Sequence, residues 1–239
     1  MQETQILDGL NNRQREAVIT TEGPVLVIAG AGSGKTRVLT QRVSYLINEK
    51  DVKPWNILAI TFTNKAANEM KERLENVIGP IFNDVWIGTF HSICVRILRK
   101  NIEKIGYKSN FNIYDTVDSK TIVKECMKQL DISDKEFTDK SILSNISNLK
   151  NDMISVEKFE IIAGQDYRQK KIAQVYRLYQ EKLKVNNAID FDDIILLTIE
   201  VLLNNPETLL YYQEKFKYIL VDEYQDTNKS QFTLVTMLA

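Results

Sequence analysis

Short continuous apolar runs alternate with longer amphipathic stretches in the first part of the chain. Continuous apolar runs are typical of buried strands, and apolar residues three or four positions apart are typical of helices. Each predicted strand is followed by a predicted helix, and this alternation predicts a parallel sheet with right-handed crossovers. The strands and their following helices are predicted at 25–29 and 35–48, 57–62 and 65–78, and 85–89 and 90–105, after a short helix at 10–18.

The pattern changes between residues 109 and 187, where helical periodicity continues and no convincing buried strand occurs. A helix is then predicted from 190 to about 203, and 218–221 is again typical of a buried strand. We interpret the chain as an α/β protein with a parallel sheet flanked by helices, formed by residues 1–108 and 188–239. An all-helical insertion at 109–187 would be entered and left at adjacent points of that domain. Its helices are predicted at 117–130, 141–149 and 168–185.

Composition narrows the class of protein. The chain has 239 residues, of which 44% are hydrophobic and 26% charged, as in ordinary soluble globular proteins. No stretch reaches the roughly 18 apolar residues that a membrane helix needs, and residues 1–10 lack the pattern of a signal peptide. Cys94 and Cys126 lack metal-ligand spacing, and with one histidine in the sequence a zinc site is not expected. These features predict a cytoplasmic protein without a membrane partner.

Charge is nearly balanced overall but uneven along the chain. The net charge is −1, so no global basic field favours nucleic acid. Residues 109–187 carry 13 basic and 12 acidic side chains, so any nucleic-acid contact of this segment would use a local face. Residues 188–239 carry three basic and nine acidic side chains. The acidity of the chain is therefore concentrated near its C-terminal end.

A glycine-rich loop lies between the predicted strand at 25–29 and the predicted helix at 35–48. Residues 29–36, Ala-Gly-Ala-Gly-Ser-Gly-Lys-Thr, have the pattern of a phosphate-binding loop with alanine at the first position. Glycines let consecutive N–H groups point into one concavity, and the N-terminus of the following helix favours an anion. Lys35 would serve the β- and γ-phosphates and Thr36 would serve Mg²⁺. A flexible glycine turn is the alternative, but the placement between strand and helix favours nucleotide binding.

Two carboxylates follow the predicted strand at 218–221. Asp222 at the carboxyl end of a strand can hold Mg²⁺ through water, and Glu223 can orient and deprotonate an attacking water. Adjacent residues of a strand point to opposite faces, so the two would divide these roles. An acidic turn after a strand is the alternative in isolation. The presence of the phosphate loop in the same chain favours the catalytic interpretation.

Six segments of the chain, taken in order, resemble the motifs of one family. They lie at 10–14, 29–36, 61–67, 88–92, 189–193 and 221–228. In this order they resemble the N-terminal region of the UvrD/PcrA/Rep group of superfamily 1 DNA helicases, over essentially the whole chain. The resemblance implies a RecA-like P-loop NTPase domain, family domain 1A, and an insertion that matches the helical domain 1B.

The resemblance also implies the residues of an ATP site. Gln14 would read the adenine edge, and Arg37 would pack on the base. Glu223 would act as the catalytic base, and Gln225 would lie near the γ-phosphate. The implied catalytic residues are Lys35, Asp222, Glu223 and Gln225, and the implied Mg²⁺ ligands are Thr36 and Asp222. The residues implied to bind ATP are Gln14, Ala29, Gly30, Ala31, Gly32, Ser33, Gly34, Lys35, Thr36 and Arg37.

A path for single-stranded DNA is implied in the same way. Sequence-tolerant binding of single strands uses aromatic faces together with groups that contact phosphates. Phe62 and Phe191 would be the stacking surfaces. The implied DNA-binding residues are Thr61, Phe62, Thr63, Asn64, Lys65, Thr89, His91 and Phe191. From the residues alone an alternative stays open, in which the two phenylalanines are core aromatics, the threonines cap helices and His91 packs at a helix start.

Three acidic residues, Asp190, Asp192 and Asp193, surround Phe191 in the sequence. Like charge beside a polyanion opposes binding, so we expect these carboxylates to point away from DNA or to pair with basic groups. The alternative is an acidic helix start that the helix dipole stabilises.

The resemblance implies an ATP-dependent helicase that moves 3′ to 5′ on single-stranded DNA and unwinds duplexes. Its cofactors would be ATP and Mg²⁺, its substrates single-stranded DNA and duplex junctions, and its accessory partners repair or replication proteins. The sequence stops before the family's arginines, stacking aromatic and second motor domain. We interpret it as an N-terminal fragment, monomeric and inactive alone. A stand-alone module that binds ATP and single-stranded DNA is the alternative, and a P-loop small-molecule kinase lacks support from 61–67 and 88–92.

Overall fold

The computed structural model describes residues 6–30 and 32–239, and the chain divides into two compact units. The sheet unit comprises residues 1–93, 210–226 and 238–239, and the helical unit comprises residues 94–209 and 227–237. The helical unit is longer at both ends than the insertion expected at 109–187. The domain boundaries inferred from the sequence stay a prediction.

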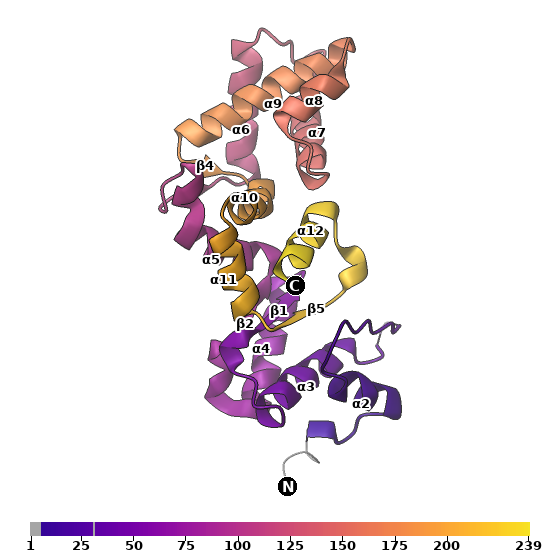
Figure 1. The fold of residues 1–239 in the computed structure, drawn as a ribbon. Coiled ribbons are helices and arrows are strands. Elements are labelled where there is room, and N and C mark those ends of the chain that lie inside the picture. Colours follow the sequence, from indigo (N-terminus) through magenta and orange to yellow (C-terminus); the bar gives the residue numbers. More distant parts are fainter. Residues whose placement is uncertain (1–5, 31) are drawn as a thin grey trace. The chain divides into compact units, whose positions relative to one another are not determined.

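The sheet unit contains a three-stranded parallel sheet with the strand order β2-β1-β5 (Figure 1). Its strands are β1 (Ile57–Thr61), β2 (Trp86–Thr89) and β5 (Tyr218–Val221). Leu58 pairs with Trp86 on one side of β1 and with Ile219 on the other. All five residues of β1 are buried, as expected for the central strand of a parallel sheet. The predicted parallel sheet is confirmed for these three strands.

Two helices cover one face of this sheet. Leu46 of α3 (Lys35–Asn48) and Met70 of α4 (Asn64–Ile78) share one apolar core with Ala59 of β1. The other face carries an aromatic group in which Trp86 contacts Tyr212 and Phe216 edge to face. The remaining elements of this unit are α2 (Asn12–Ile19), η1 (Pro54–Asn56), η2 (Gly79–Asp84) and η4 (Tyr224–Asp226). The chain passes between the units at four points. One lies between residues 226 and 227, and the other three lie within α5 (Phe90–Asn101), α11 (Pro206–Lys215) and α12 (Lys229–Leu238).

The strand predicted at 25–29 does not form, and this prediction was wrong. The segment has no regular structure, and Leu26 and Ile28 are 72% and 89% exposed. A strand needs a neighbour to satisfy its backbone N–H and C=O groups. The described strands pair as β2-β1-β5 and leave none beside this run. The hydrophobicity of residues 25–29 therefore predicted a buried strand, but none of the described strands pairs with this segment.

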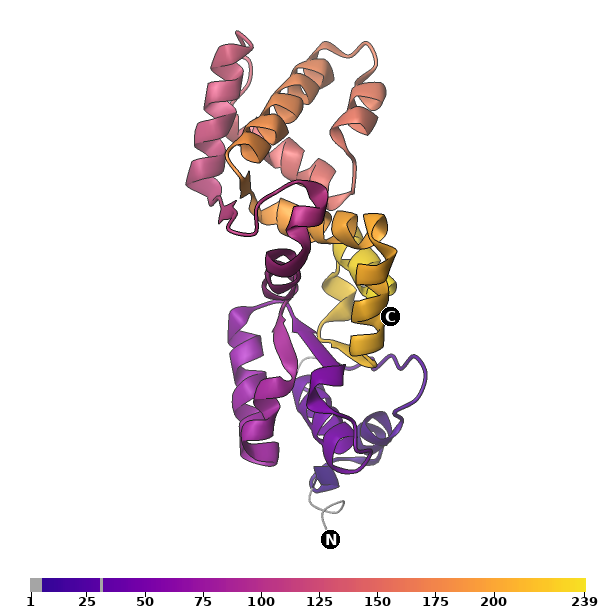
Figure 2. The ribbon, with the colours of Figure 1, turned by 60° about the vertical axis from the view of Figure 1, so that its left-hand side comes forward.

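Helices form almost all of the helical unit (Figure 2). They are η3 (Ile102–Ile105), α6 (Thr116–Gln129), α7 (Asp139–Asn151), α8 (Val156–Ala163), α9 (Tyr167–Val185) and α10 (Phe191–Asn204). Their shared core includes Val123, Ile146, Val175 and Tyr179. The predicted helices at 117–130, 141–149 and 168–185 correspond to α6, α7 and α9. The sequence interpretation missed α8, α11 and α12, and α8 is short, with only eight residues.

A two-stranded parallel ladder joins the segments before α6 and after α9. Asn112 and Ile113 of β3 (Asn112–Ile113) pair with Ala188 and Ile189 of β4 (Ala188–Ile189). The segments that precede α6 and follow α9 are therefore adjacent, and both strands of the ladder belong to the helical unit. β3 is exposed and lies outside the three-stranded sheet, which explains why hydrophobicity gave no sign of it.

In the described part of the chain, no single helix has the length and apolar content needed to cross a membrane; only the bent pair α10 and α11 meets these criteria together.

Candidate functional site

The glycine-rich loop leads directly into α3. Gly32 and Gly34 have φ values of 75° and 86°, in the left-handed region that favours glycine. A Cβ added at Gly30 or Gly32 would meet no atom within 4 Å, so the surface of the loop is open. The Ser33 hydroxyl donates to the Gly30 carbonyl oxygen at 2.6 Å and closes the turn. Ala31, which was also predicted to bind ATP, lies outside the described residues.

The N-terminus of α3 has no side-chain cap among the described residues. The helices α4, α7, α8 and α9 each begin with a Thr, Ser or Asp side chain that accepts a hydrogen bond from a backbone N–H group. The first N–H groups of a helix need such a partner, and an anion can serve as one. The start of α3 is therefore chemically suited to a phosphate group, as the motif predicts.

Lys35, the first residue of α3, pairs with a carboxylate that follows β5. Its Nζ lies 3.3 Å from Glu223 Oε1 and 3.4 Å from the Ala29 carbonyl oxygen. Gln225 Nε2 donates to the other Glu223 carboxylate oxygen at 2.5 Å. These hydrogen bonds, first from Gln225 and then from Lys35, hold the pKa of Glu223 below its usual range. Glu223 is therefore ionised at neutral pH and remains partly exposed.

Asp222 lies at the end of β5, where its backbone N–H donates to the Ile60 carbonyl oxygen at 2.9 Å. Burial, and then the charge of Glu223, raise the pKa of Asp222, whereas Lys35 and a hydrogen bond from Thr36 oppose that rise. The carboxylate and the Thr36 hydroxyl are thus adjacent. No cluster of three His, Cys, Asp or Glu side chains in the described part of the chain is suited to a metal. The residues fit Mg²⁺, which commonly takes one or two protein oxygens and obtains the others from phosphates and water.

The two predicted base-contacting residues lie on either side of the loop. Gln14 forms a capping box with Asn11 at the start of α2, and its Nε2 donates to the Ser33 carbonyl oxygen at 2.9 Å. Arg37 donates to the Asp8 carbonyl oxygen at 3.2 Å. Gln14 therefore contacts the phosphate loop itself, and Arg37 contacts the segment before α2.

The segment after β1 forms the turn that starts α4. The Thr61 side chain is buried and donates to the Thr63 carbonyl oxygen at 3.1 Å, while Thr63 caps α4 through the Ala66 N–H. Phe62 is half-buried and contacts Phe90 edge to face at 5.5 Å. The two threonines thus shape the turn. Thr63, Asn64 and Lys65 are the exposed polar residues of this segment.

The segment after β2 has a similar local design. The Thr89 hydroxyl accepts a hydrogen bond from the Ser92 N–H at 3.2 Å, and the Ser92 hydroxyl returns one to the Thr89 carbonyl oxygen at 3.0 Å. A Cβ on Gly88 would collide with the Ser92 hydroxyl, so this close approach requires glycine. Burial lowers the pKa of His91 to about 4, and the imidazole is therefore neutral at physiological pH.

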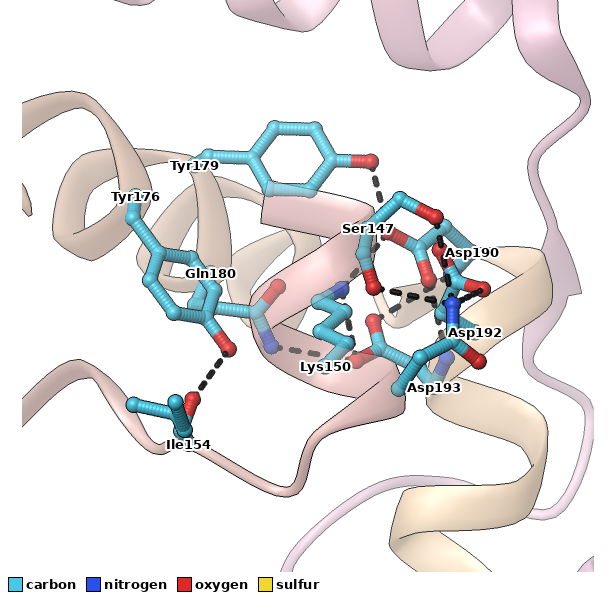
Figure 3. A network of polar contacts seen from close by, with 10 residues as sticks. Ser147, Lys150, Ile154, Tyr176, Tyr179, Gln180, Asp190, Asp192 and Asp193 are labelled. Atoms are coloured by element: carbon cyan, nitrogen blue, oxygen red, sulfur yellow. Dashed lines mark hydrogen bonds and ion pairs between the residues drawn. The ribbon is translucent and has the colours of Figure 1, made fainter. Parts of the chain in front are cut away.

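Phe191 is the first residue of α10 in the helical unit and is 58% exposed. The flanking carboxylates are held by other groups, as Figure 3 shows. The fully buried Lys150 lies 2.6 Å from Asp190 Oδ2 and 2.7 Å from Asp193 Oδ1. Asp192 accepts a hydrogen bond from Asn151 at 3.3 Å. The expectation of pairing with a basic group is therefore confirmed for Asp190 and Asp193, whereas the hydrogen bond to Asp192 comes from a neutral amide.

Further hydrogen bonds hold the two aspartates that pair with Lys150. Tyr179 donates to Asp190 at 2.9 Å, and Asp190 also caps α10 by accepting from the Asp193 N–H (Figure 3). Burial would lower the pKa of Lys150, but the charges of Asp190 and Asp193 outweigh it and raise the pKa. Lys150 therefore stays protonated. The dipole explanation of these acids was incomplete, because the buried Lys150 pairs with two of them and offsets one negative charge.

Comparison with known proteins identifies the family. The sequence matches the UvrD/REP helicase N-terminal domain over residues 10–239. The chain belongs to this family. It is 55% identical over 235 residues to the ATP-dependent DNA helicase PcrA of Bacillus subtilis (strain 168), a match that covers 98% of this chain and 32% of that protein.

Two further relatives give the same result. The chain is 53% identical to the ATP-dependent DNA helicase PcrA of Staphylococcus epidermidis (strain RP62A) and 52% identical to that of Staphylococcus aureus (strain Mu50). Each match covers 98% of this chain and 32% of the relative. The chain thus spans about a third of the length of these UvrD/REP family proteins.

The sequence interpretation missed Lys150 and Asn151, the last two residues of α7. A sequence signal for Lys150 was available. Ile142, Ile146 and Lys150 follow one another at intervals of four, so the lysine falls on the apolar face of α7. A lysine at such a position needs a buried counter-charge. The three aspartates at 190–193 were the candidates.

Proposed function

We propose that the protein is an ATP-dependent DNA helicase that moves 3′ to 5′ on single-stranded DNA, and that this chain forms its N-terminal ATP-binding part. The family match and the PcrA relatives support the proposal. The observation that carries it is the uncapped start of α3, with Lys35 beside Glu223 and Thr36 beside Asp222. The 3′-to-5′ direction rests on the motif resemblance.

The nucleotide would bind at the start of α3. The N–H groups of the loop would donate to phosphate oxygens, and Lys35 would exchange its ion pair with Glu223 for the β- and γ-phosphates. Thr36 and Asp222 would hold Mg²⁺, which neutralises charge on the phosphates when it is bound. Gln14 and Arg37 would hold the adenine, because both lie beside the loop.

Glu223 would orient the attacking water and accept its proton. Its lowered pKa keeps the carboxylate ionised, and the hydrogen bond from Gln225 fixes one carboxylate oxygen. Once phosphates hold Lys35, the other oxygen is available to the water. The partial exposure of the pair makes this exchange inexpensive, since exposed ion pairs are worth about 0–1 kcal/mol.

Single-stranded DNA would be bound by aromatic and polar side chains of the motif segments 61–67 and 189–193. Phe62 and Phe191 would stack on bases, and Asn64 and Lys65 would contact phosphates. We assign Thr61, Thr63 and Thr89 to shaping the two turns, and neutral His91 to hydrogen bonding without a charge. The substrates would be single strands and duplex junctions, in the cytoplasm, with repair or replication proteins as accessory partners.

Turnover and unwinding by the full gene product test the proposal. We expect ATP hydrolysis stimulated by single-stranded DNA, and unwinding of a duplex with a 3′ tail but not of one with a 5′ tail. Glu223→Gln should abolish both activities without abolishing nucleotide binding. Binding of ATP and DNA without stimulated hydrolysis would instead favour the stand-alone module, and unwinding only from the 5′ tail would contradict the direction.

The 239-residue chain by itself gives a second test. An arginine supplied to the γ-phosphate can be worth roughly 10³–10⁵ in rate, and the arginines that the resemblance implies belong to motifs other than the six segments of this chain. We expect the isolated chain to bind Mg·ATP weakly, to show negligible DNA-stimulated hydrolysis and not to unwind duplexes. Robust stimulation that Glu223→Gln abolishes would show that residues 1–239 suffice for the chemistry.

A further inference from the structure

Asn151, the last residue of α7, contacts two other elements of the helical unit through its amide group. Its Oδ1 accepts a hydrogen bond from Asn228 Nδ2 at 2.6 Å. Its Nδ2 donates to Asp192 Oδ1 at 3.3 Å and to the Ser147 carbonyl oxygen at 2.9 Å. One side chain thus connects the start of α12 with the first turn of α10.

Asn228 is held firmly at its own end of this connection. Its Oδ1 accepts from the Gln231 N–H and from the Ser230 hydroxyl, both at 2.9 Å, and its N–H donates to Gln231 Oε1 at 3.0 Å. This reciprocal arrangement caps α12 and fixes the orientation of the amide. Nδ2 is therefore directed at Asn151. Asn228 also ends the segment 221–228 that begins with the two acidic residues of the ATP site.

The other end of the connection is equally fixed. Asp192 follows Phe191 in the first turn of α10, and Asp190 and Asp193 of the same turn bind Lys150. The last two residues of α7 thus hold all three carboxylates of this turn. Phe191 is the member of the turn that is exposed.

We propose that Asn151 is a positioning residue that couples the segment carrying Asp222 and Glu223 to the turn carrying Phe191. This inference rests on the proposed function. A movement of 221–228 during nucleotide turnover either keeps or breaks the bond between Asn228 and Asn151. Because the amide of Asn151 also holds Asp192, a change at Asn228 alters the support of the Phe191 turn. Coupling between sites requires an element with two arrangements that both ligands bias, and in this proposal those arrangements would be the intact and the broken bond.

The test is the stimulation of ATP hydrolysis by single-stranded DNA in the full gene product. For Asn151→Ala we expect the stimulation factor to fall at least about fivefold, the lower end of typical coupling between sites. The unstimulated rate and the DNA affinity without nucleotide should each change less than about twofold, because Asn151 contacts neither ligand in this proposal. Asn145→Ala is the matched control. Asn145 is an exposed residue of α7 whose Nδ2 donates to the Ser141 carbonyl oxygen at 2.8 Å.

Exchanging Asn and Asp between positions 151 and 192 tests these hydrogen bonds without the loss of side-chain volume that Asn151→Ala causes. Asn151→Asp keeps the acceptor for Asn228 but places a carboxylate against Asp192, and should lose stimulation. The double variant Asn151→Asp with Asp192→Asn restores the donor–acceptor pairs with Asn228 and with residue 192. It does not restore the hydrogen bond to the Ser147 carbonyl oxygen, so it should recover the stimulation in part. This pair of variants remains informative if Asn151→Ala does not fold. Recovery in the double variant is a readout that a general loss of stability would not produce.

The outcomes separate this inference from the function on which it rests. A wild-type protein without DNA-stimulated hydrolysis would overturn the proposed function and this inference with it. Stimulation in the wild type that persists in Asn151→Ala, or that falls equally in Asn145→Ala, would overturn the inference alone. A double variant that stays as uncoupled as Asn151→Asp would also overturn it.

Discussion

Two lysines pair with carboxylates at the starts of two helices, with opposite consequences. Lys35 begins α3, its side chain is 27% exposed, and one oxygen of Glu223 lies 3.3 Å away. Lys150 reaches the first turn of α10 from the end of α7, its side chain is fully buried, and two aspartates lie within 2.7 Å. Lys35 can exchange its partner, whereas Lys150 cannot leave its partners without losing their charge compensation.

The two helix starts differ in the same way. Asp190 caps α10 through the Asp193 N–H, so this N-terminus is already satisfied by the protein. No side chain in the described residues caps α3. An N-terminus that the protein leaves uncapped can accept a phosphate, and one that is capped contributes to stability instead. Five changes break or sharpen this comparison.

Lys150→Met should produce the largest effect. Removing the lysine leaves two carboxylates buried together, and breaking a buried ion pair in this way costs about 3–5 kcal/mol of unfolding free energy. Denaturant unfolding of the 239-residue chain, followed by circular dichroism, measures it. Lys140→Met, at an exposed position of the same helix, is the matched control and should be nearly neutral.

The origin of the loss can be checked separately. Replacing Asp190 and Asp193 by Asn in the Lys150→Met background removes the uncompensated charge and should recover part of the lost stability. A loss below about 1 kcal/mol for Lys150→Met alone would mean that the cluster behaves like a surface ion pair.

Phe191→Ala tests whether the start of α10, which Asp190 caps, also binds DNA through the exposed ring of Phe191. A ring that stacks on a base is worth about 1–3 kcal/mol, so the single-strand affinity of the full gene product should fall by that amount. Tyr167→Ala is the matched control, because Tyr167 is the first residue of α9 and is equally exposed at 58%. An equal fall in both variants, or reduced stability with unchanged affinity, would favour a structural role for Phe191.

Much of the fold could be predicted from periodicity, and the exception has a physical cause. The helix at 35–48 and the strand at 57–62 match α3 and β1 closely, because both patterns describe how one element meets its own core. The run at 25–29 failed because a strand needs hydrogen bonds from another segment, and hydrophobicity does not identify that partner. β3 was not predicted for a related reason. Its two residues are exposed, so only its backbone pairing with β4 defines it as a strand.

The residues of the candidate site also differ in whether local sequence or a distant partner determines their place. The loop at 29–36 and the acids Asp222 and Glu223 could be proposed from the sequence because each proposed role requires a residue type at a fixed local spacing, and these roles stay a prediction. The DNA-binding assignments stay a prediction, and the structure adds that Thr61 and Thr63 serve the turn. The spacing of Ile142, Ile146 and Lys150 indicates a buried lysine, but local sequence does not identify its partners. Asp190 lies 40 residues away and is brought to Lys150 by the packing of α7 and α10.

His91 lies at the start of α5 and is partly buried. The effect of its protonation on stability can be tested by varying the pH. Its folded pKa of about 4 lies below the usual value of 6.5, so the unfolded chain takes up the proton first as pH falls. The part of the unfolding free energy that depends on a neutral His91 is fully present above about pH 6.5 and is lost as the pH falls toward 4. Because the ring is only partly buried, we expect a loss of about 1–2 kcal/mol between pH 7 and pH 5.

His91→Gln supplies the reference for that titration. The carboxylates titrate in both proteins, so their contribution cancels when the two pH dependences are subtracted. The variant should lose less stability than the wild type between pH 7 and pH 5. Identical losses would mean that the imidazole is protonated in the folded protein at pH 5.

Gly34→Ala tests the open helix start directly. The φ of 86° at Gly34 is costly for an L-residue, and an added Cβ would lie 3.2 Å from Gln14 Nε2. We expect a loss of about 1–2 kcal/mol in unfolding free energy. Gly30→Ala is the control, because its φ lies outside the left-handed region and its added Cβ would meet no atom within 4 Å. Equal effects at both positions would mean that the loop conformation does not depend on Gly34.

Lys35→Met should have the smallest effect on stability and a large one on ligand binding. Glu223 remains partly exposed and keeps its hydrogen bond from Gln225, so the unfolding free energy should change by less than about 1 kcal/mol. Mg·ATP affinity, measured by calorimetry on the full gene product, should fall because the positive charge for the phosphates is gone. A stability loss close to that of Lys150→Met would contradict the comparison, because the Lys35–Glu223 pair would then be part of the folded framework and unable to exchange with a phosphate. Unchanged stability with lost nucleotide affinity would assign Lys35 to the ligand and Lys150 to the fold.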